Sequence, residues 1–105
     1  MTESQSIDTR RALRHPIVVE IEVTDQLSGI KIKDHTRDLS RFGCGVTTTT
    51  PFPAGTKVTL KIVHGNKEIV AFGQVMYGRP DIGMGIAYTN VSPKDQELLE
   101  DLFGD

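Results

Sequence analysis

Residues 37–46 of this 105-residue chain read R-D-L-S-R-F-G-C-G-V, and the rest of the sequence is organised around this run. Within it, Asp38, Ser40 and Gly43 have the spacing D-x-S-x-x-G. Residues two apart on an extended backbone face the same side, so Asp38 and Ser40 are expected to present a carboxylate and a hydroxyl side by side. Glycine at positions 43 and 45 removes side chains where a strand bends or where a flat ligand approaches closely.

A cluster of arginines lies upstream of this run. Arg10, Arg11 and Arg14 precede Pro16, which biases His15 away from the helical conformation. The arginines are therefore expected on a flexible arm that leads into the first strand. R-x-x-x-R followed by D-x-S-x-x-G resembles the two-part signature of the PilZ domain, the bacterial receptor module for cyclic di-GMP. The resemblance extends to the downstream strand pattern and covers most of the chain from Arg10 onward.

Length and composition indicate one globular domain. A chain of 105 residues with 37% hydrophobic and 25% charged residues is able to bury a single core. Residues 1–9 lack the apolar centre of a signal peptide and are expected to form a flexible tail, with one domain over residues 10–105. The apolar runs are too short to span a membrane, so a cytoplasmic location is expected. A net charge of −2 argues against general nucleic-acid binding.

Alternation of apolar and polar residues predicts an antiparallel sheet of about six strands. Gly73 is expected to bend its strand, and Gly83 and Gly85 are expected to mark bulges or close approaches. The predicted strands are residues 17–23, 30–34 with a distorted continuation through the D-x-S segment, 46–50, 57–63, 67–79 and 82–89.

The last predicted element is a helix. Ser92 is a suitable N-cap and Pro93 a suitable first helical residue. An apolar stripe then follows, formed by Leu98, Leu99, Leu102 and Phe103. The fold class is therefore mainly β with one C-terminal helix. The PilZ resemblance implies that the strands close into a six-stranded antiparallel β-barrel.

The arginines suit the ligand that the resemblance implies. A guanidinium binds phosphate oxygens bidentately and also binds the O6/N7 edge of guanine. The resemblance therefore assigns Arg10 and Arg14 to the guanine edges and phosphates of cyclic di-GMP. Arg11 either assists them or is a solvated charge. Arg37 and Arg41 either extend this basic rim or are ordinary strand-edge charges, of which the second is favoured.

The resemblance places Asp38, Ser40 and Gly43 around one guanine. A carboxylate accepts hydrogen bonds from guanine N1–H and N2–H₂, Ser40 is expected to bind a phosphate or orient Asp38, and Gly43 lets the backbone approach. The alternative is that Asp38 and Ser40 make local turn bonds to backbone N–H groups, as these residue types often do.

No catalytic or metal-binding pattern is present in the sequence. The three histidines are scattered and there is one cysteine, so a zinc site and an internal disulfide are not expected. Cys44 is expected to be a small packed side chain, and His15 either stacks on a base or exposes its polar tip. Neither a G-x-S-x-G nucleophile elbow nor a P-loop occurs. The chain is therefore expected to be neither an enzyme nor the holder of a cofactor.

The leading hypothesis is a cyclic di-GMP receptor whose arginine arm closes over the ligand and alters the surface offered to an effector protein. The resemblance suggests partners in motility or exopolysaccharide production, with a monomer as the default state. One alternative is a PilZ-like adaptor that works through protein contacts without nucleotide. Another is a barrel for single-stranded nucleic acid, which the absence of tryptophan and the negative charge disfavour.

Overall fold

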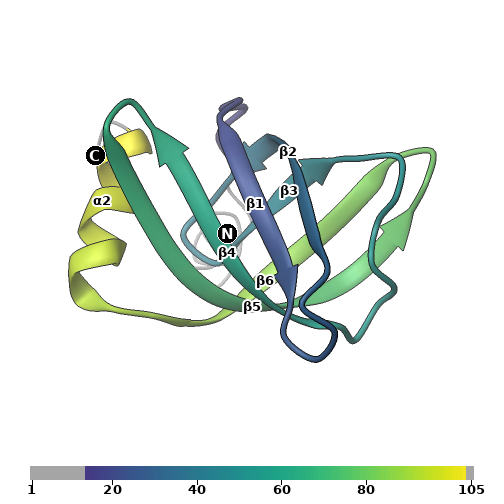
Figure 1. The fold of residues 1–105 in the computed structure, drawn as a ribbon. Coiled ribbons are helices and arrows are strands. Elements are labelled where there is room, and N and C mark those ends of the chain that lie inside the picture. Colours follow the sequence, from purple (N-terminus) through teal and green to yellow (C-terminus); the bar gives the residue numbers. More distant parts are fainter. Residues whose placement is uncertain (1–13, 104–105) are drawn as a thin grey trace, which may run out of the picture.

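Six antiparallel strands close into a barrel, and one helix follows them (Figure 1). The computed structural model describes residues 14–103. The strand order around the barrel is β1-β2-β3-β6-β5-β4. The elements are β1 (Glu20–Asp25), β2 (Lys31–Leu39), β3 (Gly43–Thr47), β4 (Lys57–His64), β5 (Lys67–Arg79), β6 (Gly83–Val91) and α2 (Pro93–Phe103). This architecture confirms the mainly β fold and the barrel that the PilZ resemblance implied. The expected tail, residues 1–9, lies outside the described residues.

The barrel interior is filled by alternate residues of the strands. In β4, Val58, Leu60 and Ile62 are fully buried, as the period of two predicted. The same alternation in β5 buries Ile69, Ala71 and Val75. Burial of this apolar surface is the main driving force for closing the sheet, at about 25 cal/mol per Å².

The first strand begins at Glu20, later than the sequence predicted. Residues 17–19 are held against the barrel by Thr36. Some of their backbone hydrogen bonds are therefore made with a side chain instead of a neighbouring strand. The backbone N–H of Val19 donates to Thr36 Oγ1 (3.0 Å), and the Thr36 hydroxyl donates to the carbonyl of Ile17 (2.7 Å). Hydroxyl groups that bond to nearby backbone compete with regular sheet structure in this way.

The third strand is Gly43–Thr47, whereas residues 46–50 were expected. Its glycines pair with β6, where Gly43 faces Ala87 and Gly45 faces Gly85. The strand ends where Thr48 Oγ1 accepts the backbone N–H of Thr50 (3.1 Å). Local turn bonding therefore replaces the threonine strand that the β-branched composition suggested.

Helix α2 lies against one end of the barrel (Figure 1). As predicted, Ser92 caps it, because Ser92 Oγ accepts the backbone N–H of Asp95 (3.2 Å). Asp95 Oδ1 also accepts the backbone N–H of Val70 in β5 (3.2 Å), which anchors the start of the helix to the barrel wall. Leu99 is fully buried, and the other members of the predicted apolar stripe pack partly buried against the core. Within residues 14–103, no helix is long and apolar enough to cross a membrane.

Candidate ligand-binding site

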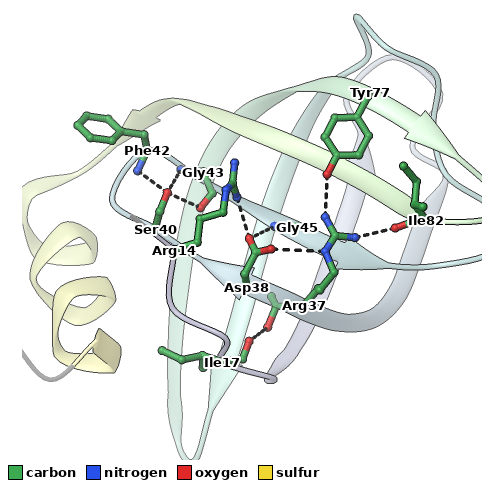
Figure 2. Close-up of polar contacts among 11 residues, drawn as sticks. Arg14, Ile17, Arg37, Asp38, Ser40, Phe42, Gly43, Gly45, Tyr77 and Ile82 are labelled. Carbon is green, nitrogen blue, oxygen red and sulfur yellow. Dashed lines mark hydrogen bonds and ion pairs between the residues drawn. The ribbon is translucent and has the colours of Figure 1, made fainter. Parts of the chain in front are cut away.

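The two halves of the sequence signature meet in the structure. Arg14 Nη1 lies 2.7 Å from Asp38 Oδ1 (Figure 2). The backbone places Arg14 there, because the His15 N–H donates to the Leu39 carbonyl (2.7 Å) and the Leu39 N–H donates to the His15 carbonyl (2.9 Å). This bridge pairs the end of the arginine arm with β2 immediately beside Asp38. Arg10 and Arg11 lie outside the described residues, and their assignment to the ligand stays a prediction.

A bulge in β2 turns Asp38 toward the outside of the barrel. Thr36 pairs with Val46 and Asp38 pairs with Gly45, so Arg37 is an extra residue on β2. Neighbouring side chains of a regular strand point to opposite faces, and a bulge re-aims them. Arg37 and Asp38 are therefore both partly exposed, between the buried residues Thr36 and Leu39. The distorted continuation of β2 expected from the sequence is this bulge.

The Asp38 carboxylate is held on several sides. Its Oδ1 accepts the backbone N–H of Gly45 (3.1 Å) as well as Arg14, and its Oδ2 lies 3.4 Å from Arg37 Nε. The side chain is 17% exposed, and the two guanidinium groups lie on opposite sides of it (Figure 2). Hydrogen bonds to charged groups are stronger than neutral ones. The carboxylate is therefore fixed in place, and a small part of the side chain remains open to solvent.

Ser40 closes the turn between β2 and β3. Its Oγ accepts the backbone N–H groups of Phe42 (3.2 Å) and Gly43 (3.1 Å), and its hydroxyl donates to the Gly43 carbonyl (3.1 Å). The residue is 3% exposed. These are the local turn bonds that the sequence offered as an alternative, and they shape the loop that follows Asp38. A contact between Ser40 and a ligand stays a prediction.

Gly43 is required by the barrel itself. A Cβ at this position would overlap the carbonyl oxygen of Ile86 in the neighbouring strand β6. The residue is also buried. Glycine at position 43 thus permits close strand pairing, and the approach of a ligand to its backbone stays a prediction.

Arg37, favoured from the sequence as an ordinary strand-edge charge, is instead bound on several sides next to Asp38. Its Nη1 donates to the Ile82 carbonyl (2.6 Å) and its Nη2 donates to the Tyr77 hydroxyl (2.7 Å) (Figure 2). Gly45 makes room for it, since a Cβ there would overlap the guanidinium. Two G-x-G triplets, at residues 43–45 and 83–85, were the available signal. They indicate two strands whose outer face is cleared of side chains.

Two contacts connect the site to helix α2. The His15 ring stacks on the Phe103 ring, with centroids 4.5 Å apart and an interplanar angle of 15°. Arg41 Nε, in the turn after Ser40, lies 3.5 Å from Glu100 Oε2. Both segments that form the candidate site, the arm and the turn, therefore contact the C-terminal helix.

Cys44 is buried in the core, as expected from its neighbours in the sequence. Burial, reinforced by the negative charge of Asp38, raises the pKa of the Cys44 thiol to about 12. Burial also raises the pKa of Tyr88, and the neighbouring Cys44 thiol adds to this effect. Among residues 14–103, no three histidine, cysteine, aspartate or glutamate side chains are grouped to hold a metal ion.

We expect Cys44 to be unreactive in the folded protein. At about pH 8 a thiol with a pKa near 12 ionises about 1,000-fold less than one with the ordinary value of 9.0, and only the thiolate attacks. Ellman's reagent should therefore label the protein only as fast as it unfolds, and fully in urea. Because the folded pKa is the higher one, stability is lost as the pH rises from about 9 toward 12. Rapid labelling without denaturant would contradict the buried placement.

The comparisons agree with the fold and the motif. The sequence model of the PilZ domain matches residues 8–105, so the chain belongs to the PilZ domain family. PilZ domains are known as cyclic di-GMP-binding domains and act as receptors or adaptors.

Among the solved structures that resemble the chain are a PilZ domain from a cellulose-synthesizing bacterium and a motility inhibitor. The PilZ domain of CeSA from a cellulose-synthesizing bacterium has a TM-score of 0.72 at 20% identity, over 89% of this chain and 97% of that one. The inhibitor of motility MotI/DgrA from Bacillus subtilis has a TM-score of 0.68 at 18% identity, over 88% of this chain and 48% of that one. At these identities the likeness shows the fold alone. No curated protein matches the sequence.

Proposed function

We propose that this protein is a cyclic di-GMP receptor that binds the nucleotide between the arginine arm and Asp38. The observation that carries the proposal is the 2.7 Å contact between Arg14 and Asp38. It brings a group that recognises phosphate and the guanine O6/N7 edge next to one that recognises guanine N1–H and N2–H₂. The Arg14 side chain is 50% exposed, so it has room to turn from Asp38 toward a ligand.

Binding requires little reorganisation of Asp38. Arg14 occupies Oδ1 in this structure, and guanine donors take its place while Arg14 moves to the nucleotide. The Gly45 N–H and Arg37 still hold the carboxylate after this exchange. A group that is already fixed loses little conformational freedom on binding, and this favours affinity.

The contacts with α2 provide a route by which binding changes the protein surface. Drawing Arg14 toward a ligand pulls on the adjacent His15, whose ring stacks on Phe103. The arm and α2 are then the surfaces offered to an effector protein, without an enzymatic step, in the cytoplasm. Motility or exopolysaccharide production is the proposed setting, because the two similar structures come from a motility inhibitor and from a cellulose-synthesizing bacterium.

The second candidate is an adaptor that works through protein contacts without nucleotide. One observation favours it, namely that Ser40 and Gly43 have structural roles of their own in the turn and the barrel. The presence of these residues is therefore explained without a ligand. The Arg14–Asp38 contact favours the receptor.

Calorimetric titration and thermal unfolding with cyclic di-GMP test the proposal. At a free ligand concentration 100 times Kd, the free energy of unfolding should rise by about 2.7 kcal/mol, and Tm by about 10 °C or more. GTP and cyclic di-AMP serve as specificity controls and should raise Tm far less than cyclic di-GMP at the same concentration. Arg14→Ala should remove the shift, whereas Arg79→Ala should retain it, because Arg79 is exposed and pairs with Asp81. An unaltered melting curve and no heat of binding would leave the adaptor as the function.

A further inference from the structure

The Arg37 guanidinium is immobilised on the barrel wall. Three of its five N–H donors are used, by Asp38, the Ile82 carbonyl and the Tyr77 hydroxyl. Arginine side chains on surfaces usually retain several rotamers, and fixing one costs conformational entropy. Here the three hydrogen bonds offset this entropy cost during folding. The planar group is therefore already positioned before any ligand binds.

The wall beneath this group is cleared of side chains by two glycines. Asp38, Gly45, Gly85 and Tyr77 form one row in register across β2, β3, β6 and β5. A Cβ at Gly45 would overlap the Arg37 guanidinium, and a Cβ at Gly85 would overlap the Tyr77 ring. Glycine inside a strand weakens it, and at these two positions it permits Arg37 and Tyr77 to lie against the wall.

The Arg37 side chain keeps 37% of its surface exposed. One side of the guanidinium is against Gly45, so the exposed part includes the opposite, outward side. A planar cation open to solvent on one side is a stacking surface for a purine, since guanidinium groups stack on aromatic faces. Two of its N–H donors remain available for oxygen acceptors around the base.

We propose that Arg37 is a pre-formed shelf on which one guanine of cyclic di-GMP stacks, namely the guanine that Asp38 does not hold. This inference rests on the proposed function. The Asp38 carboxylate and the Arg37 guanidinium both lie directly against Gly45, side by side. A base that bonds edge-on to the carboxylate lies in the plane of the Asp38 and Arg37 groups. A base that stacks on the guanidinium lies above that plane. The two contacts therefore need two bases, which a cyclic dinucleotide has and GMP lacks.

Titrations of cyclic di-GMP and GMP against Arg37 variants test this role. Arg37→Ala and Arg37→Lys should each weaken cyclic di-GMP binding about tenfold, because lysine keeps the charge but lacks the planar face. GMP affinity, followed by NMR, should fall by clearly less than cyclic di-GMP affinity, because GMP loses only the support that Arg37 gives to Asp38. Tyr77→Phe keeps the ring and loses the oxygen that holds Nη2, so its loss should be smaller. Arg79→Ala is the charge control. It removes one positive charge from β5, away from Arg37, and should bind like the wild type.

The Arg37 Nε–Hε resonance provides a direct readout that a merely structural role would not move. A stacked guanine should shift Hε upfield on addition of cyclic di-GMP, and GMP should not produce this shift. Equal weakening of both nucleotides by Arg37→Ala would mean that Arg37 only positions Asp38, and would overturn the shelf. The shelf would also be overturned if Arg37→Ala bound cyclic di-GMP as tightly as the wild type and had the same Tm. A wild-type protein that binds no cyclic di-GMP would remove the proposed function and the shelf together.

Discussion

Asp38→Ala raises the Kd for cyclic di-GMP at least about 100-fold and leaves the barrel folded. The carboxylate supplies both acceptors for one guanine edge, and each hydrogen bond to a charged group contributes about 1.5–3 kcal/mol. Losing two of them exceeds the 2.7 kcal/mol that corresponds to a factor of about 100. The barrel should stay folded because Asp38 lies outside the apolar core, although the Gly45 N–H loses its acceptor. Calorimetric titration measures the first effect and urea unfolding the second.

Two further variants make the Asp38 result specific. Asp34→Ala removes the same charge from the same strand. Asp34 lies beside His35, and the variant should bind like the wild type. Asp38→Asn keeps an acceptor for the Gly45 N–H but offers guanine one acceptor instead of two, so its affinity should be intermediate. Wild-type affinity in Asp38→Ala would place the nucleotide elsewhere.

Gly43→Ala lowers the free energy of unfolding by about 3 kcal/mol. The added Cβ would overlap the Ile86 carbonyl oxygen, which belongs to the backbone of the paired strand. Neither partner moves away easily, because β3 lies between β2 and β6 in a closed barrel. Overpacking that cannot relax costs about 1–3 kcal/mol and occasionally more. Urea denaturation followed by circular dichroism measures this loss.

Gly65→Ala is the matched control. Gly65 lies in the β4–β5 hairpin turn with φ = 63° and nothing within 4 Å of an added Cβ. Its cost is backbone strain alone, about 1–2 kcal/mol. If Gly43→Ala instead kept wild-type stability and lost nucleotide binding, the ligand rather than the barrel would be the reason for glycine at position 43.

Local signals explain the parts of the fold that the sequence predicted. The period of two marks the apolar residues of β4, and the bounds predicted for β5, residues 67–79, agree with the structure. Ser92 and Pro93 predicted the start of α2 for reasons of capping chemistry. These features depend on residues close together in the chain, where spacing alone carries the information.

The organisation around Arg37 depends on contacts between distant segments. A single extra residue in β2 turns both Arg37 and Asp38 outward, and no periodicity reveals which residue is the extra one. The purpose of Gly45 and Gly85 becomes visible only when β3 and β6 are known to be neighbours. The motif predicted that Arg14 and Asp38 act together, and the structure adds a third group beside them.

Ring closure of the strands limits which parts of this molecule can move. Every strand has two hydrogen-bonded neighbours, so loosening one of them breaks two ladders and approaches the cost of global unfolding. The segment that carries His15 and the last turn of α2 are held to each other by a pair of rings. Separating these two rings breaks no strand ladder, so it should cost less free energy than opening the barrel wall. Under the proposed function, the arm and the last turn of α2 are therefore the parts that respond to the ligand, while the barrel keeps its shape.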